Sequence, residues 1–270
     1  MVLSFEIQHL SLDYAIILSM AFSWRVRKQL SYLSIVILAL VLIVGFFAWR
    51  QFSGGTCFDN KQNQKETGAD CGGPCLPCPV GLKEPILLWV KFFPINDTVY
   101  DVAALIENLN YNWSSERIVY AFKLYDKDNV LIIERDGTTF LNGKETAFLF
   151  ESGLRTGQRK PSRAVLEIEP VKIWKYTEKF SPQFIVAKKN FNPSSSLLEI
   201  EIKNDTSSSF ADIYLFAALF DKENNAFAAS ATKIDRIAGI ASQKANFTWQ
   251  KKFDSEPSRI EIYARVKVIK

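Results

Sequence analysis

Residues 118–129 read IVYAFKLYDKDN, and residues 213–224 read IYLFAALFDKEN. Apolar side chains alternate along both stretches, and a period of two residues is typical of a β-strand with one buried face. Each stretch ends in an aspartate followed by Lys-Asp-Asn or Lys-Glu-Asn, which favours a tight turn. The pattern therefore predicts a strand and a hairpin turn at two places in the chain. The alternating residues are Ile118, Tyr120, Phe122 and Leu124, then Ile213, Leu215, Ala217 and Leu219.

The opposite faces of these two predicted strands differ in character. The first carries Lys123, whereas the second carries Phe216 and Phe220. A charged side chain indicates contact with solvent, and large apolar side chains on both faces indicate burial on both sides. We therefore predict that the second strand is covered on both of its faces.

Matching residues recur around both strands at one spacing. Asn108 and Asn204 each end an apolar strand, 96 residues apart (204 − 108), and Asp126 and Asp221 are 95 residues apart (221 − 126). Anchors that keep one offset to within a residue indicate an internal repeat, so we interpret the region as a tandem duplication. Two further anchors match, Gly143 with Gly239 and Pro161-Ser162-Arg163 with Pro257-Ser258-Arg259.

Each repeat contains short alternating stretches separated by turn signals. This arrangement, without helical periodicity, is typical of an antiparallel β-sandwich. We predict an all-β fold of two tandem antiparallel Ig-like β-sandwiches, residues 85–178 and 179–270, behind one N-terminal transmembrane helix. The expected strands of the first sandwich are 86–93, 99–107, 117–125, 130–134, 145–150 and 164–175.

The sequence Phe122-Lys123-Leu124-Tyr125-Asp126 resembles the F-x-L-Y-D signature of the FxLYD-type immunoglobulin-like domains. The second repeat has Ala217 and Phe220 in place of Phe and Tyr, but it keeps Leu219 and Asp221. The resemblance covers roughly residues 85–270. It implies small extracytoplasmic sandwich modules on membrane-anchored bacterial or archaeal proteins, with no established catalytic residues.

An apolar run, Leu30–Trp49, precedes the repeats and contains no charged residue. Twenty residues at about 1.5 Å each span the roughly 30 Å hydrocarbon core of a bilayer. Arg25, Arg27 and Lys28 come just before the run, so the positive-inside rule places segment 1–29 in the cytoplasm and the remainder outside. The run is longer than a cleaved signal's apolar region, which predicts an uncleaved signal anchor, 30–50, in the cell membrane. Met1 and Met20 both remain candidate starts.

All four cysteines lie in the Gly/Pro-rich segment 51–84. The spacing of Cys75 and Cys78 suits a zinc ligand pair, but cysteines outside the membrane normally oxidise. We therefore predict a disulfide-rich stalk with two disulfides among Cys57, Cys71, Cys75 and Cys78, while the three pairings remain open.

Oxygen-bearing side chains lie between these cysteines: Asp59, Asn63, Glu66 and Asp70. They are candidate Ca²⁺ ligands, and they serve equally as turn formers and caps. The segment resembles the motif C-x-D-G-x-x-N-x-x-E-x-x-x-D-C-G-G-x-C-x-x-C of bacterial and archaeal surface proteins, with Asn60 in the usual Gly position. That resemblance implies an extracytoplasmic stalk knot.

The composition narrows the classes of function. The net charge of +4 provides no concentrated basic face for nucleic acid. His9 is the only histidine, so the chain after the apolar run has no His-based metal site and no Ser-His-Asp triad. The loop ESGLRTGQRKPSR groups Arg155, Arg159, Lys160 and Arg163, which suits either an anionic contact or a solvated hairpin loop.

These observations predict a protein that is not an enzyme. We expect a membrane-anchored extracytoplasmic binding or structural protein of the cell envelope or of an adhesion assembly. Its expected partners are the lipid bilayer, through Leu30–Trp49, and a protein of the envelope, and calcium is the one candidate cofactor. The alternative is an accessory subunit of a membrane secretion, transport or pilus complex, in which the helix itself makes the specific contacts.

Overall fold

The computed structural model describes residues 23–52, 56–178 and 182–268. The chain divides into two compact units, and the boundary falls after Cys78. Met1, Met20 and His9 lie outside the described residues, as does most of the predicted cytoplasmic segment 1–29.

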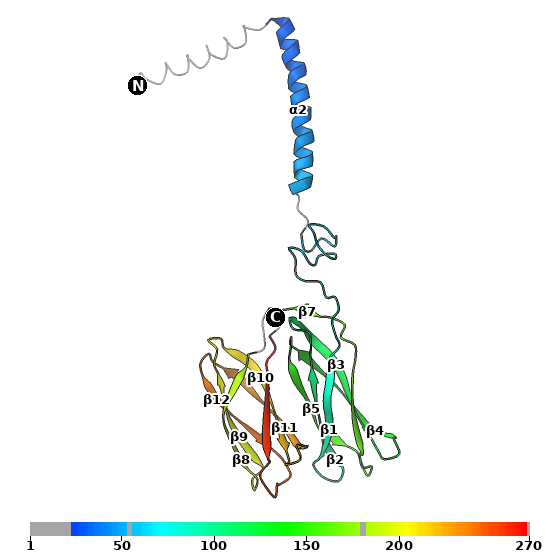
Figure 1. Ribbon diagram of the computed structural model, residues 1–270, viewed down its shortest axis with the longest axis vertical. Coiled ribbons are helices and arrows are strands. Elements are labelled where there is room, and N and C mark those ends of the chain that lie inside the picture. Colours follow the sequence, from blue (N-terminus) through cyan, green and yellow to red (C-terminus); the bar gives the residue numbers. More distant parts are fainter. Residues whose placement is uncertain (1–22, 53–55, 179–181, 269–270) are drawn as a thin grey trace, which may run out of the picture. The chain divides into compact units, whose positions relative to one another are not determined.

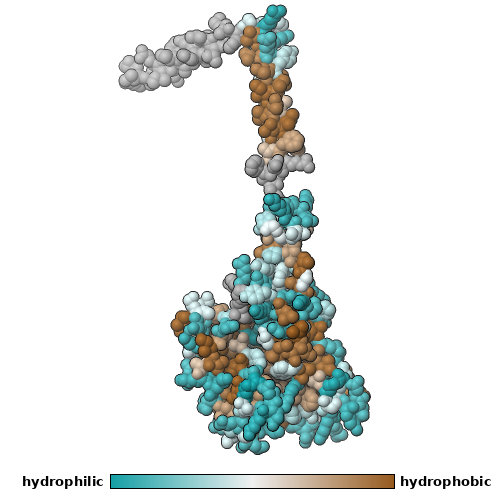
Figure 2. All heavy atoms as spheres, in the orientation of Figure 1, coloured by the Kyte–Doolittle hydropathy of each residue, from teal (hydrophilic) through white to brown (hydrophobic). Residues whose placement is uncertain are grey.

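The N-terminal unit contains one long helix, α2, which runs from Trp24 to Phe52. Its middle carries only apolar or small side chains, shown in brown in Figure 2. The stretch Trp24–Trp49 is long and apolar enough to cross a membrane, and none of it is buried against other parts of the protein. A helix that is apolar all round needs an apolar surrounding, because no face of it suits water.

A three-stranded and a four-stranded antiparallel sheet form the first sandwich (Figure 1). One has the order β1-β2-β5, and the other has the order β4-β3-β6, with the short β7 pairing with the start of β3. The strands are β1 (Ile86–Pro94), β2 (Val99–Glu107), β3 (Trp113–Tyr125), β4 (Leu131–Leu141), β5 (Thr146–Arg155), β6 (Arg163–Ile168) and β7 (Lys175–Tyr176).

The second sandwich repeats this strand order. Its sheets are β8-β9-β12 and β11-β10-β13, so that β8 to β13 take the places of β1 to β6 in turn. In the described residues, the predicted all-β fold of sandwiches behind one apolar helix is confirmed. The strands are β8 (Phe184–Asn192), β9 (Leu197–Asn204), β10 (Phe210–Phe220), β11 (Ala226–Ile237), β12 (Ser242–Thr248) and β13 (Arg259–Arg265).

Some strand ends differ from the prediction. β4 continues to Leu141, seven residues beyond the predicted end at residue 134 (141 − 134). Gly137 pairs with Tyr120, and a Cβ at Gly137 would lie 2.3 Å from the Tyr120 ring. This glycine makes room for an aromatic ring across the strand pair and does not end the strand. The last strand was also predicted too long, since β6 ends at Ile168, just before Pro170.

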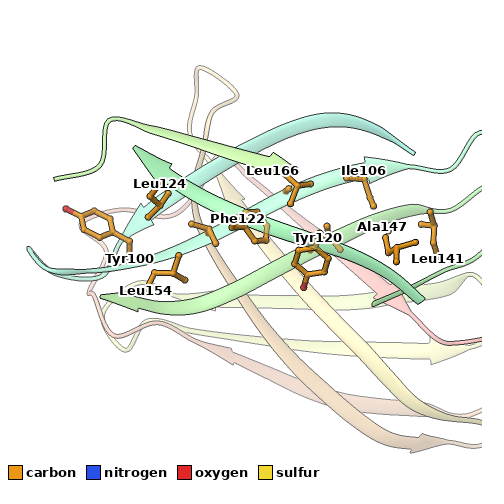
Figure 3. Packing of buried hydrophobic residues seen from close by; sticks show 13 residues of the cluster. Tyr100, Ile106, Tyr120, Phe122, Leu124, Leu141, Ala147, Leu154 and Leu166 are labelled. Atoms are coloured by element: carbon orange, nitrogen blue, oxygen red, sulfur yellow. The ribbon is translucent and has the colours of Figure 1, made fainter. Parts of the chain in front are cut away.

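The core of the first sandwich lies between its two sheets. Phe122 and Leu124 on β3 are fully buried and lie among side chains such as Leu154 of β5 and Leu166 of β6 (Figure 3). The predicted alternation on β10 is confirmed in the same way, because Ile213, Leu215, Ala217 and Leu219 are all buried.

The two sandwiches pack against each other through the outer faces of two sheets. Phe148 on β5 stacks on Phe216 of β10, with ring centroids 5.4 Å apart, and contacts Tyr263 of β13. Ala103 and Leu105 on β2 belong to the same buried cluster as Ala218 and Phe220 on β10. The prediction that the second repeat's strand is covered on both faces is therefore confirmed. Its second cover is the first sandwich.

Candidate ligand-binding groove and cysteine-rich loop

A buried ion pair joins the end of the second sandwich to the first. Arg265, the last residue of β13, is 3% exposed, and its Nε donates to Glu145 Oε1 at 2.7 Å. The same guanidinium donates to the Phe140 carbonyl and lies over the Phe140 ring. Asn142 Nδ2 in turn donates to the Val266 carbonyl at 3.0 Å. Because these bonds are directional and shielded from water, they fix the orientation of one sandwich on the other.

A groove with a volume of about 1020 Å³ opens between the two sandwiches. One wall is built from the ends of β1 and β5 and the start of β2, and the other from the start of β11 and the segment after β12. Figure 1 shows β11 beside the first sandwich, and β11 contacts β1, β2 and β5. The volume lies at the upper end of the roughly 300–1,000 Å³ range of ligand pockets.

Small side chains on β11 explain why the sandwiches leave this space open. The strand begins Ala226-Phe227-Ala228-Ala229-Ser230-Ala231, and all six residues line the groove. Alanine and serine extend only one or two heavy atoms from the backbone, so the facing strands cannot fill the gap. The second sandwich also contributes Phe227, Trp249 and Phe253, and the Phe253 ring contacts each of the other two rings edge to face.

Charged side chains lie on both walls of the groove. Asp101 and Arg155 come from the first sandwich, and Lys251 comes from the second. Asp101 Oδ1 accepts a hydrogen bond from Gly153 N at 2.9 Å. Burial raises the pKa of Asp101, and the Gly153 hydrogen bond lowers it by less. Among the described residues, neither Arg155 nor Lys251 has an ion-pair partner.

Replacing Asp101 by asparagine is expected to stabilise the sandwiches at neutral pH. Asparagine keeps the acceptor for Gly153 N but removes a half-buried charge. The folded-state pKa of Asp101 is raised above its unfolded-state value, so between these two pKa values the native form binds more protons than the unfolded form. The free-energy cost of the buried charge therefore appears as pH rises above the unfolded-state pKa and is complete above the folded-state pKa. Urea unfolding of residues 79–270 should show the gain at pH 7 and its disappearance below about pH 4. If Asp101→Asn and the unaltered protein had the same free energy of unfolding at every pH, this interpretation would be contradicted.

The structure divides the predicted basic loop. Arg163 donates to Asn129 and lies over the Tyr125 ring, while Arg159 lies 3.9 Å from the Asp126 carboxylate, so both support the β3–β4 hairpin. Lys160 is exposed, and only Arg155 lines the groove. The interpretation as a hairpin loop therefore accounts for two of the four cations. Arg155 is the one of the four that lies in a candidate site.

The cysteines form two disulfides, Cys57–Cys75 and Cys71–Cys78. This result selects one of the three possible pairings. Asn60, which stands in the usual Gly position of the motif, has a φ of 56°. Glycine and asparagine are the residues that adopt this left-handed conformation most readily, so the substitution keeps the loop geometry.

The four candidate calcium ligands are engaged within the loop. Asp70 accepts from the backbone N–H groups of Asp59 and Asn60, and Glu66 Oε2 accepts from Asn63 N. Asp59 Oδ2 accepts from Asn63 Nδ2, and this bond lowers the pKa of Asp59. In the part of the chain that the structure describes, Asp59, Glu66 and Asp70 do not converge as a ligand group.

One acidic cluster does form, but its chemistry does not suit a metal. The carboxylate of Glu66 converges with the sulfurs of Cys57 and Cys75, and Glu66 Oε1 contacts Cys75 Sγ at 3.0 Å. Both sulfurs belong to a disulfide, so neither is a thiolate ligand. Asn63 Oδ1 is buried without a partner among the described residues. The calcium site stays a prediction.

Reduction is expected to loosen this loop far more than removal of calcium. A disulfide that closes a loop of this size contributes about 3 kcal/mol in the chain-entropy view. We expect limited proteolysis within residues 56–78 to accelerate strongly in the paired variant Cys57→Ser, Cys75→Ser, and more than it does when a calcium chelator is added to the unaltered protein. Calcium-dependent protection of the unaltered loop would instead support the calcium site.

The residues of the two matching stretches build the fold and do not line the groove. Phe122 and Leu219 are buried in the cores, and Asp126 Oδ1 accepts from the backbone N–H groups of Asp128 and Val130 in the hairpin turn. Asp221 Oδ1 accepts from Asn225 N in the same way.

Sequence reasoning missed the groove and the Arg265–Glu145 pair. The small residues of β11 and an arginine inside the apolar strand IEIYARV were the visible signals.

Comparisons with known proteins identify no family. No protein-family model matches the chain, and no curated protein matches its sequence. Among solved structures, red sea bream transglutaminase is similar over 68% of this chain and 31% of that one, at 10% sequence identity and a TM-score of 0.23. The chain thus spans about a third of that protein's length, and a TM-score this low carries no functional argument. Function is therefore inferred from the chain's own residues.

Proposed function

We propose that this protein is a non-catalytic, membrane-anchored binding protein of the cell envelope or of an adhesion assembly. Two fixed sandwiches outside the membrane present the inter-sandwich groove to a ligand. The observation that carries the proposal is the groove itself, with aromatic rings and uncompensated charges on walls that a buried ion pair holds in place. Pockets of this character are the usual places for ligands.

The anchor is α2. Trp24 and Trp49 lie 25 residues apart (49 − 24), which is roughly 38 Å along a helix, and both side chains are exposed. Tryptophans at this separation suit the two interfaces of a bilayer. Arg25, Arg27 and Lys28 at the N-terminal end favour a cytoplasmic N-terminus, so that both disulfides lie in an oxidising compartment.

We also infer that the two sandwiches are copies of one FxLYD-type module. Asn108 Nδ2 donates to the carbonyls of Trp113 and Asn142, and Asn204 Nδ2 donates to those of Ser208 and Ala238. Both asparagines accept from the N–H two residues later. Gly143 and Gly239 complete the match, because a Cβ on either would strike a backbone oxygen of the facing loop, that of Tyr111 or Ser207. A shared strand order and the shared hydrogen bonds of a buried asparagine favour duplication over coincidence.

Membrane topology tests the proposal. In intact cells, external protease should cleave within residues 79–270, whereas in inverted vesicles this region should be protected. Exchanging Arg25, Arg27 and Lys28 for asparagine should reverse the orientation of part of the population, because these cations set it. Protection of the sandwiches in intact cells would contradict the proposal.

The competing function is that of an accessory subunit that contacts a membrane complex through α2. It is supported by the apolar surface of that helix, none of which is buried within the protein. Lipid covers such a surface equally well. Exchange of the helix for an unrelated apolar helix therefore distinguishes the two functions, because only the accessory subunit would lose its partner.

A further inference from the structure

We propose that the groove between the sandwiches binds an acidic saccharide, a chain of sugars that carry carboxylate groups. This inference rests on the proposed binding function and specifies the class of ligand. It follows from the charges, the rings and the strand edges that surround the groove.

Two cations favour an anionic ligand. Arg155, at the end of β5, and Lys251, after β12, line opposite walls, and neither has an ion-pair partner among the described residues. Asp101 is the acidic residue of the groove, and Gly153 N already donates to it. A guanidinium and an ammonium that line one groove suit a ligand with more than one carboxylate, because charge-assisted hydrogen bonds are the stronger kind.

The apolar part of the lining suits sugar rings. Phe227, Trp249 and Phe253 present aromatic surface on the second wall. A pyranose has C–H groups on its ring faces and hydroxyls at its rim, so it needs apolar surface and polar side chains together. Asn96, Asp101 and Gln250 add such polar groups to the lining of the same groove.

The strand edges argue against a peptide ligand. An extended peptide usually adds to the free edge of a sheet through main-chain hydrogen bonds. β11 is the outermost strand of its sheet, but the indole Nε1 of Trp249 donates to the Ala229 carbonyl at 2.9 Å and Ser230 Oγ donates to the Thr248 carbonyl. On the other wall, β1 ends at Pro94, which has no N–H. Side chains, and not strand addition, therefore provide recognition here.

The test is calorimetric titration of the full chain in nanodiscs with three probes: a hexamer of galacturonate, the neutral maltohexaose and a hexaglutamate peptide. We expect saturable binding of the hexauronate and at least tenfold weaker binding of the other two. Arg155→Gln and Lys251→Gln should each weaken hexauronate binding about tenfold, the value of one charge-assisted hydrogen bond. Lys160→Gln and Lys252→Gln remove equal charges outside the groove and should change nothing.

A variant that fills the groove distinguishes failure of the proposed ligand class from failure of the proposed binding function. Ala231 is exposed and lines the groove, so Ala231→Trp should fold and abolish binding. If maltohexaose or hexaglutamate binds as tightly as the hexauronate and Ala231→Trp abolishes that binding, the ligand class is wrong but the binding function stands. Absence of hexauronate binding, or equal losses in the Lys160→Gln and Lys252→Gln controls, overturns the inference.

Discussion

Replacing Arg265 by alanine is expected to destabilise residues 79–270 by about 3–5 kcal/mol, the usual loss when one partner of a buried ion pair is removed. The variant leaves the Glu145 carboxylate, which is 8% exposed, without its cation. It also removes donors from Thr139 Oγ1 and the Phe140 carbonyl. Urea unfolding followed by tryptophan fluorescence would measure the loss.

Matched variants distinguish the effect of removing a buried charge from the effect of any substitution near this end of the chain. Lys267→Ala lies two residues away and breaks an exposed pair with Glu116, so it should cost at most about 1 kcal/mol. The double variant Arg265→Met, Glu145→Met should recover much of the stability, because it leaves no unpaired charge in the interface. A loss below 1 kcal/mol in Arg265→Ala would show that the sandwiches do not depend on this pair.

The second large effect is expected at two positions at once. Asn108→Ala and Asn204→Ala should each destabilise residues 79–270 by about 2–4 kcal/mol, since each removes a buried amide that donates to two carbonyls and accepts from one backbone N–H. Both side chains are at most 1% exposed. Near-equal losses would support two copies of one module.

Asn246→Ala is the control for these two variants. Asn246 lies in β12 with an exposed side chain, so its removal should change stability by at most about 0.5 kcal/mol. A large loss at Asn108 beside a small one at Asn204 would contradict the equivalence of the two sandwiches.

Local patterns in the sequence were sufficient to predict most of the strands and the candidate anchor, and they indicate the repeat that we propose. The alternation of Ile118, Tyr120, Phe122 and Leu124 predicts a strand because one face meets the core, and that face is buried. The spacing of Asn108 and Asn204 was sufficient to match them as equivalent positions. Their hydrogen bonds could not be predicted, because their partners lie up to 34 residues away.

Features that depend on two distant surfaces could not be predicted. In the sequence, Arg265 is one more charged residue near the C-terminus. Its partner Glu145 lies 120 residues earlier, and only the folded structure brings the two together. The outer face of β2 reads as ordinary apolar sequence, and nothing in it shows that the second sandwich provides the cover. The groove depends on the small residues of β11 facing the ends of β1 and β5, and so it appears only when the two sandwiches are assembled.

Photo-crosslinking in the native membrane tests most directly whether the groove makes the specific contact. A photoreactive residue is placed at Phe227, in the groove, or at Leu40, in α2. We expect a discrete adduct from position 227 that survives exchange of residues 30–49 for an unrelated apolar helix and is lost in Ala231→Trp. A discrete adduct that forms only from position 40, and disappears when the helix is exchanged, would contradict the account.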